Sequence, residues 1–229
     1  MTTKKGKIEI TENGPYKVSW SVPLDEESYI PDENWASLDY KKEKDFPLQE
    51  EYFLCRCWKS KNKPFCDSTH LKIEFDWTET ANNEKYLDKV ELYEWQEVDL
   101  LDCEEFCAGA RFCDAYNRAW QMVINPQNEK ETELAIGEAI KCPGWRLTIK
   151  TKDWKLVDPE LEEWITALND PSLWVRWPLK IKWKIPIISL NWKIYEIRNR
   201  VTLCRCWKSQ NKPFCDWSHI QDKYEWDWI

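Results

Sequence analysis

Alternating apolar and polar residues predict β-strands in the amino-terminal part of the chain. Residues 8–24 alternate on either side of Asn13-Gly14, a dipeptide that favours tight turns between strands. Residues 51–54 continue this pattern as a further short strand. Residues 25–50 are polar and contain prolines, which is typical of a loop. We therefore expect short strands joined by one long loop.

Apolar residues in the middle of the chain recur with the period of an α-helix. Residues 129–140 place Leu134, Ala135, Ala139 and Ile140 on one side of a helix and predict an amphipathic helix. A shorter helix is expected over residues 102–109. The remaining segments are expected to be a strand at residues 90–93, a hairpin around Asp153-Trp154 at residues 145–158, and a short helix or acidic linker at residues 159–175.

The strand pattern recurs near the carboxyl terminus. Residues 14–24, GPYKVSWSVPL, align with residues 177–187, WPLKIKWKIPI. Each segment precedes one of two nearly identical stretches, LCRCWKSKNKPFCDSTH at residues 54–70 and LCRCWKSQNKPFCDWSH at residues 203–219. The repeat therefore covers a whole domain and predicts two copies of one small β-rich unit.

Each copy carries three cysteines and one histidine at metal-ligand spacing. Thiols two residues apart in an extended segment share one side, and a cysteine and a histidine four apart share one face of a helical turn. Each pair can hold one metal atom, so the set suits a [2Fe–2S] cluster or a single tetrahedral zinc. The eight candidate ligands are Cys55, Cys57, Cys66 and His70 in the first copy, and Cys204, Cys206, Cys215 and His219 in the second.

The pattern C-x-C-x2-S-x3-P-x-C-D-x-[ST]-H resembles the CDGSH iron–sulfur domain. The resemblance implies a [2Fe–2S] cluster in each copy, with the Cys-x-Cys pair on one iron and the cysteine and histidine on the other. It also implies that the two copies pack together. The family's glycine after Cys-Asp is replaced by Ser68 and Trp217. The matching polar residues expected beside the ligands are Ser60, Asp67, Ser209 and Asp216.

Four more cysteines lie between the copies. They are Cys103, Cys107, Cys113 and Cys142, the last followed by proline. Four cysteines ending in Cys-Pro suit a [4Fe–4S] cluster, and the spacing resembles the divergent mono-cluster ferredoxin-like domain. The glycines of that family's late motif are shifted or replaced here. The alternative is a set of structural or zinc-binding cysteines.

The composition of the chain argues against several classes of function. The chain has 229 residues, a net charge of −8 and no basic run, which argues against nucleic acid or an anionic membrane as partner. The amino terminus has no apolar core typical of a signal peptide, and no apolar stretch is long enough to span a membrane. Ten cysteines without a secretory signal favour metal binding over disulfides. We expect a cytoplasmic protein.

Tryptophan is unusually frequent, with 17 tryptophans against 5 glycines. Several occupy positions where a tight turn or the CDGSH motif requires glycine. We hypothesise that these tryptophans stand for glycines, as would result if the source reads the UGA codon as glycine and the codon was translated here as tryptophan. The alternative is an aromatic-rich core or ligand surface. The residues concerned include Trp58, Trp77, Trp154, Trp192, Trp207 and Trp217.

The sequence thus predicts a β-rich α+β protein, with two CDGSH-like domains packed as a pseudo-twofold pair around a ferredoxin-like insert. The expected boundaries are 1–82, 83–158 and 176–229, with a linker or short helix at 159–175. Both histidines are candidate ligands and no phosphate-binding loop is present, so no enzymatic activity is expected. Electron or cluster transfer with a protein partner is favoured over a zinc-stabilised interaction module or an accessory redox subunit.

Overall fold

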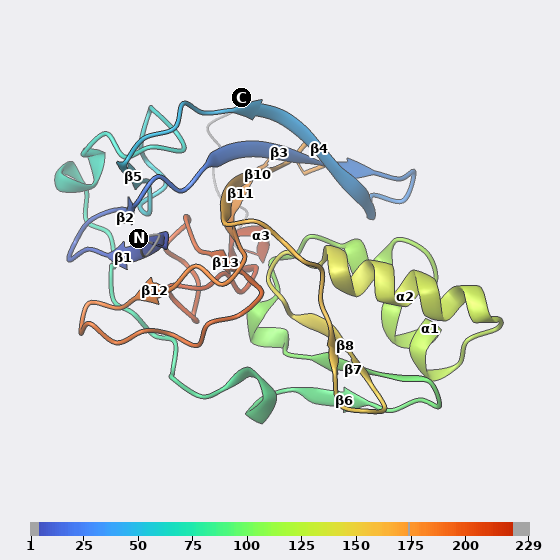
Figure 1. Ribbon diagram of the computed structural model, residues 1–229. Helices are drawn as coiled ribbons and strands as arrows, with labels where there is room; N and C mark the ends of the chain where they lie inside the picture. Colours follow the sequence, from blue (N-terminus) through green and yellow to red (C-terminus); the bar gives the residue numbers. More distant parts are fainter. Residues whose placement is uncertain (1–4, 174, 222–229) are drawn as a thin grey trace.

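The computed structural model describes residues 5–173 and 175–221 of the chain. Three sheets organise this part of the protein (Figure 1). Two of them belong to the repeats and share a continuous apolar core, while the third belongs to the middle of the chain. Among the described helices, none is long and apolar enough to cross a bilayer.

The first sheet has the strand order β12–β1–β2–β5. Strands β1 (Lys7–Ile10), β2 (Tyr16–Ser19) and β5 (Glu51–Leu54) come from the first repeat and pair antiparallel. The fourth strand, β12 (Ile187–Ile188), comes from the second repeat and pairs parallel with β1. The strands predicted over residues 8–24 and 51–54 are therefore confirmed.

The second sheet has the order β13–β11–β10–β3–β4. Here β3, from the first repeat, pairs parallel with β10, which precedes the expected start of the second repeat at residue 176 and pairs antiparallel with its strand β11. The second repeat therefore contributes β12 to the first sheet, and the first repeat contributes β3 and β4 to the second. The bounds are β3 (Leu24–Pro31), β4 (Ser37–Asp45), β10 (Trp164–Asp170), β11 (Val175–Lys182) and β13 (Arg200–Leu203).

The strand registers agree with the sequence alignment of the repeats. Tyr16 pairs with Leu54 in the first repeat, and the aligned Leu179 pairs with Leu203 in the second. Just beyond these strands, the aligned Trp20 and Trp183 both have left-handed φ angles, of 73° and 55°. The repeated unit thus extends over the strands as well as the cysteine loops.

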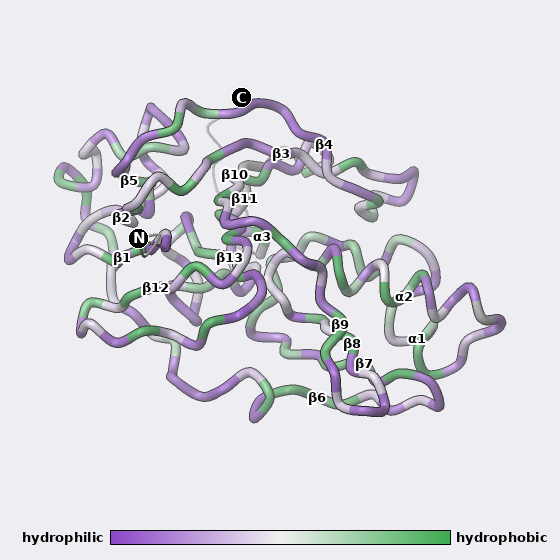
Figure 2. The backbone as a smooth tube through the Cα atoms, viewed as in Figure 1, coloured by the Kyte–Doolittle hydropathy of each residue, from purple (hydrophilic) through white to green (hydrophobic). Residues whose placement is uncertain are grey.

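Two expectations from the sequence are wrong. Residues 25–50 form the long β3–β4 hairpin rather than a loop. Its outer strand β4 is an edge strand with charged residues on both faces, so it lacks the usual alternation (Figure 2). Residues 159–175 contain strand β10 rather than a helix. A central strand is buried on both faces and shows no alternation of apolar and polar residues, as the buried Ile165 and Leu168 illustrate.

The third sheet, β6–β7–β8–β9, forms the middle domain together with two helices that lie on one side of it (Figure 1). Leu100 and Ile149 of the sheet and Met122 and Ala135 of the helices are fully buried against one another. The predicted strand, helix and hairpin are confirmed. The bounds are β6 (Glu91–Tyr93), β7 (Val98–Asp102), β8 (Leu147–Thr151), β9 (Leu156–Val157), α1 (Ala119–Ile124) and α2 (Glu129–Lys141).

Short helical turns complete the described structure. The helix predicted over residues 102–109 is only the 3-10 turn η3, since Cys103 and Cys107 at its ends have extended backbones. The turns are η1 (Thr69–Lys72), η2 (Tyr86–Asp88), η3 (Glu104–Phe106), η4 (Phe112–Asp114) and the short α3 (Ser218–Gln221).

Nine tryptophans of the described chain have left-handed backbones, a conformation that costs a non-glycine residue about 1–2 kcal/mol. They include five of the six proposed from the sequence; the exception is Trp77. Trp192 is 77% exposed, so burial of its indole does not offset this cost, and Trp154 is 78% exposed, with its ring in contact with the ammonium of Lys150 at 3.6 Å. The backbone supports the glycine hypothesis. The nine are Trp20, Trp35, Trp58, Trp145, Trp154, Trp183, Trp192, Trp207 and Trp217.

Candidate metal centres

The first cysteine loop begins where β5 ends. Its two ligand pairs face inward as the sequence spacing predicts. Cys55 Sγ lies 3.9 Å from Cys57 Sγ. Cys66 Sγ lies 3.4 Å from His70 Nδ1, with His70 held on the turn η1. The bridge between Leu54 and Phe65 brings the two pairs to the same end of the sheet.

The second loop repeats this geometry after β13. Cys204 Sγ lies 3.5 Å from Cys206 Sγ, and Cys215 Sγ lies 3.5 Å from His219 Nδ1. The bridge between Leu203 and Phe214 is the counterpart of the bridge in the first loop. Both candidate sites therefore consist of a Cys–Cys pair and a Cys–His pair.

The ligand separations suit tetrahedral coordination by a thiolate-binding metal. Two thiolates bound about 2.3 Å from one tetrahedral metal are about 3.8 Å apart, and a nitrogen ligand shortens the edge slightly. Each pair has this spacing. Among the described residues, however, no three histidine, cysteine or acidic side chains converge on a single ion. The spacing of each Cys–Cys and Cys–His pair lets it hold one metal atom, as a [2Fe–2S] cluster needs.

Serine and aspartate side chains hold each loop in shape. Ser60 Oγ donates to the carbonyl of Phe65 at 2.6 Å. Asp67 accepts hydrogen bonds from the backbone N–H groups of Lys61 and Thr69 at 2.8 and 3.0 Å, and so connects the loop to the start of η1. In the second loop, Ser209 donates to Phe214 at 2.7 Å and Asp216 accepts from Gln210 at 2.7 Å.

The two departures from the CDGSH pattern do not disturb the ligand geometry. Ser68 and Trp217, which replace the glycine after Cys-Asp, have φ angles of 68° and 61°. This is the left-handed region that glycine occupies without cost. The Trp217 side chain is 39% exposed and leaves room for the pair formed by Cys215 and His219. The fold therefore keeps the backbone of a glycine at both positions.

Burial favours the protonation states that bind metal. It lowers the pKa of His70, and that of His219 to about 4, so both imidazoles are neutral at pH 7. A hydrogen bond from Cys57 lowers the pKa of Cys55, and one from Cys206 lowers the pKa of Cys204. One thiol in each Cys–Cys pair is therefore more easily deprotonated than the other.

Each loop is also supported by the other repeat. The charge of Arg205 in the second loop helps to lower the pKa of Cys55 in the first. The phenol of Tyr16, on β2, donates to the carbonyl of Cys204 at 2.7 Å. The ring of Phe75, after the first loop, lies 6.0 Å from that of Trp207. The two candidate sites are thus held together by reciprocal contacts.

Three of the four cysteines of the middle domain share one cavity. Cys107, Cys113 and Cys142 line it together with Arg146. After burial, the largest cause, the charges of Asp114 and of the other two cysteines raise the pKa of Cys113 further. The three thiols are therefore close neighbours that could hold a cluster.

Cys103 lies elsewhere. It is 2% exposed and packs in the main apolar core with Tyr86 and Phe106. Burial, followed by the charge of Glu105, raises its pKa to about 12. The structure therefore brings together three members of the predicted four-cysteine set and places Cys103 apart from them.

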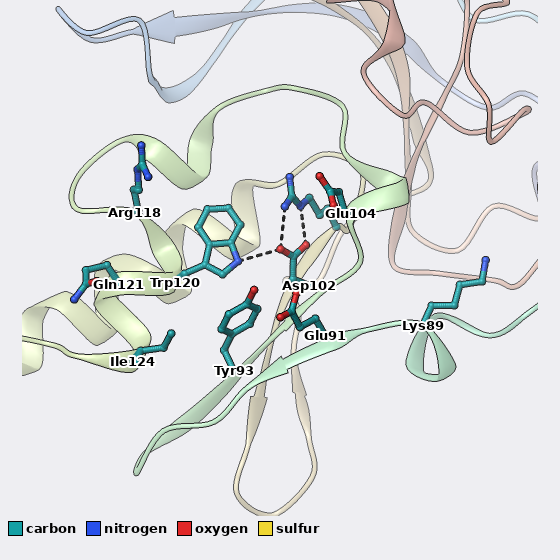
Figure 3. Close-up of a pocket in the computed structure, with 10 residues that line it drawn as sticks. Lys89, Glu91, Tyr93, Asp102, Glu104, Arg118, Trp120, Gln121 and Ile124 are labelled. Carbon is teal, nitrogen blue, oxygen red and sulfur yellow. Dashed lines mark hydrogen bonds and ion pairs between the residues drawn. The ribbon is translucent and has the colours of Figure 1, made fainter. Parts of the chain in front are cut away.

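Arg146 is a residue of the middle site that the sequence did not predict. Its guanidinium donates to both carboxylate oxygens of Asp102, at 2.7 and 2.9 Å. Trp120 Nε1 donates to the same carboxylate at 3.0 Å (Figure 3). Arg146 lines both the cysteine cavity and an open pocket of about 550 Å³ on the surface of the domain. Its charge lowers the pKa of Cys107 against the larger effect of burial. An arginine after Cys-Pro has no distinctive spacing, so no sequence pattern marked it.

Comparison with known families agrees with the geometry of the repeats. The family model described as "Iron-binding zinc finger CDGSH type" matches residues 13–71 and 177–220, which include every candidate ligand of both loops. Domains of this type bind [2Fe–2S] clusters, so the match indicates iron–sulfur cluster binding. Searches of curated proteins and of solved structures returned no match.

Proposed function

We propose that this chain is an iron–sulfur protein that transfers electrons or clusters to a protein partner. It holds two [2Fe–2S] centres, each bound by three cysteines and one histidine, and a third iron–sulfur centre in the middle domain, where Cys107, Cys113 and Cys142 supply three of the four thiolates that a [4Fe–4S] cluster takes. The observation that carries the proposal is the repeated pair geometry, in which Cys–Cys and Cys–His pairs have tetrahedral spacing in both loops.

The separation of the pairs favours [2Fe–2S] over zinc in the repeats. A single zinc needs four ligands around one point, whereas a two-iron cluster needs two ligands on each iron. Within the described chain the ligands form pairs and do not converge on one ion. The family match supports the same choice.

The reciprocal strands support a pseudo-twofold pairing of the two domains. Strand β12 of the second repeat pairs parallel with β1, and β3 of the first repeat pairs parallel with β10. In each case the neighbouring pairing is antiparallel, β1 with β2 and β10 with β11. The sheet next to the first loop, β5–β2–β1–β12, therefore has the same strand arrangement as β13–β11–β10–β3 next to the second loop.

The cavity lined by Cys107, Cys113 and Cys142 supports the middle centre. Three thiolates carry a strong negative charge, which Arg146 at the cavity wall partly balances. Thiolate ligands of this kind suit an iron–sulfur cluster. The middle domain also packs against the two repeats, as an electron carrier with several centres requires.

Each centre supplies one-electron chemistry when its cluster is bound. The protein holds the clusters and sets their environment. A neutral histidine in place of a thiolate removes negative charge, which raises the reduction potential. The Cys66–His70 pair lies nearer the surface than the Cys215–His219 pair, since Cys66 is only half-buried and Cys215 is 1% exposed. The first centre is therefore the better placed of the two for exchange with a partner.

Metal analysis tests this function. The protein is purified without oxygen, and iron, acid-labile sulfide and zinc are counted per chain with a visible spectrum alongside. We expect about eight iron and as many sulfides. About four iron with a [2Fe–2S] spectrum would remove the middle centre from the proposal. Zinc without sulfide would overturn it in favour of a structural interaction module. Copurification with an enzyme would assign the chain as an accessory redox subunit.

A further inference from the structure

We infer that a cavity between the β3–β4 hairpin and helix α2 binds a small organic ammonium ion with a short apolar stem. The volume of this cavity is about 150 Å³, which equals that of an engineered protein cavity that holds a benzene molecule. The cavity shares only Phe112 with the cavity of the three cysteines. The inference therefore goes beyond the proposed function and does not depend on a bound cluster.

Hydrogen bonds between the hairpin and the helix enclose this ammonium cavity (Figure 1). The hydroxyl of Tyr40, on β4, donates to the carbonyl of Lys141 at 2.6 Å. The ammonium of Lys141 donates to the carbonyl of Leu38 at 2.6 Å and forms an ion pair of 3.3 Å with Asp39. The turn η4 contributes Phe112 to the lining. Hairpin and helix are thus fixed to each other at the end of α2.

Apolar groups supply much of the lining, including Phe112, Leu134 and Ala115. Gly137 lines the same space from within α2, and a Cβ built on it would meet no atom within 4 Å outside the backbone of the helix. Glycine destabilises the interior of a helix relative to alanine, and no neighbouring atom requires it here. The missing side chain leaves room for the apolar stem of a ligand.

Two buried polar side chains of the lining lack a hydrogen-bond partner at one oxygen, within the part of the chain that the structure describes. Glu138 is 3% exposed, and its Oε1 accepts from the backbone N–H of Tyr116 at 3.2 Å, whereas its Oε2 has no partner. Ser37, on β4, is fully buried, and its Oγ has no partner either. Burying such groups unpaired is costly. A ligand that donates hydrogen bonds would satisfy both oxygens.

The charges around the cavity favour a cation. Glu138 and the exposed Glu133 line it, while the ammonium of Lys141 is already paired with Asp39. Burial raises the pKa of Glu138 to about 8, and the charge of Asp114 adds to this effect. Among the described residues, no cation forms an ion pair with Glu138. An ammonium ion would supply the counter-charge that this carboxylate lacks.

Titration with n-butylammonium chloride tests the inference. The full chain, purified without oxygen, is titrated in a calorimeter at about pH 8, where Glu138 loses its proton more readily. We expect saturable binding of one ion per chain. The alcohol n-butanol has the same shape without the charge and should bind about tenfold more weakly or worse. Tetramethylammonium, which has no hydrogen-bond donor, should not bind.

No saturable heat, as expected if water alone fills the cavity, overturns the inference, and so does equal affinity for n-butanol. An ammonium group of this kind occurs both in free amines and in lysine side chains. Titration with Nα-acetyl-lysine methylamide distinguishes these sources. If it binds as n-butylammonium does, the cavity accepts a lysine side chain of another protein; if only n-butylammonium binds, the ligand is a free amine.

Variants of the lining locate the bound ion. Glu138→Gln keeps the shape of the side chain and removes its charge, so it should weaken n-butylammonium binding about tenfold or more. Glu131→Gln, on the same helix but outside the lining, is the matched control and should leave the affinity unchanged. Gly137→Leu should abolish binding by filling the cavity. Equal affinity in Glu138→Gln and the unmodified chain contradicts the assignment.

Ser37→Ala separates ligand binding from a structural role. It removes a buried hydroxyl that has no partner among the described residues, so the unliganded protein should unfold at the same or a higher temperature. The affinity for n-butylammonium should nevertheless fall a few-fold. Thermal unfolding of every variant shows that it is folded. A Ser37→Ala variant that is less stable but binds with unchanged affinity would make the serine a structural residue and overturn the inference.

Discussion

The hydroxyl of Tyr16, on a strand of the first repeat, donates a 2.7 Å hydrogen bond to the carbonyl of Cys204, a ligand residue of the second repeat. The same oxygen lies 3.3 Å from the carbonyl of Pro213 in that loop. The aligned residue of the second repeat is Leu179, which has no hydroxyl. The first repeat therefore supports the second loop through this hydroxyl, whereas Leu179 cannot make the equivalent hydrogen bond to the first loop.

Tyr16→Phe should loosen the second centre alone. The change leaves buried carbonyls with one partner fewer and should lower the free energy of unfolding by about 1 kcal/mol. Iron loss from the second centre to a chelator should become faster, as followed by the visible spectrum. Tyr52→Phe is the control, because Tyr52 bonds to the carbonyl of Val22, outside both loops. Equal cluster loss in the two variants would contradict the role of Tyr16.

Exchanging the histidine ligands should protect the clusters from acid. A protonated imidazole cannot bind iron, whereas a thiolate has no protonation step in the same range. His70→Cys should slow acid loss of the first cluster and leave the second unchanged, and His219→Cys should do the reverse. Visible spectra after a drop in pH follow each cluster. Unchanged loss in His70→Cys would refute its role as ligand.

The four cysteines of the middle domain should differ in their effect on its iron. Cys113→Ala should remove the iron of the middle centre, because Cys113 lines the cavity with Cys107 and Cys142. Cys103→Ala should keep that iron and reduce only stability, because the Cys103 thiol packs in the main core. Iron and sulfide counts distinguish the two. Equal iron loss from both variants would place Cys103 among the ligands.

Glycine should stabilise the protein at exposed left-handed tryptophans. Trp154→Gly and Trp192→Gly each remove a strained backbone at an exposed position. Trp192→Gly should raise the free energy of unfolding by about 1 kcal/mol, and Trp154→Gly by less, because it also loses the contact of the Trp154 ring with Lys150. Trp120→Gly is the control and should destabilise, because Trp120 lies in helix α1 and bonds to Asp102. Thermal unfolding measures all three. The coding DNA gives an independent test, since TGG codons at Trp58, Trp154 and Trp217 would exclude recoding.

The free energy of unfolding should rise with pH because of the buried Lys180. Burial lowers the pKa of this lysine to about 7, and its ammonium lies 3.6 Å from the ring centroid of Tyr40. Above pH 7 the unfolded chain binds a proton there that the folded chain does not, so the free energy of unfolding rises between about pH 7 and 10. The other charged groups that act on Lys180 are Lys182, Glu27, Arg200 and Asp25.

Lys180→Met should remove this rise and stabilise the protein at pH 6, where the folded lysine is charged. Denaturant unfolding at several pH values measures the slope. Lys17→Met, at the equivalent position of the first repeat, should keep the slope, because Lys17 lies at the surface beside Glu51 and its pKa is raised. If the slope persists in Lys180→Met, the pH dependence of stability must come from other titratable groups.

The sequence predicted the cluster loops well because their chemistry is local. The spacing of Cys66 and His70 decides that they meet, and the structure places the two atoms 3.4 Å apart. The aligned residues Tyr16 and Leu179 also pair with the equivalent Leu54 and Leu203, as two copies of one unit should. Features of this kind depend on neighbours in the chain.

Long-range features were not predictable in the same way. The polar edge strand β4 has no alternation, and the central strand β10 has no polar face, so neither showed the strand period. The separation of Cys103 from Cys107 depends on packing against Tyr86, which is distant in sequence. Arg146 bonds to Asp102 across two strands, and only tertiary structure brings them together.

The exchange of β3 and β12 between the repeats has a consequence for symmetry. Because the two halves belong to one polypeptide, their assembly is an intramolecular event that does not depend on protein concentration. Two identical subunits would have to carry the same surface twice. Joined halves are free to diverge, so Arg200 and Phe214 of the second repeat can contact the middle domain while Phe65, the counterpart of Phe214, packs against Phe46 of its own repeat.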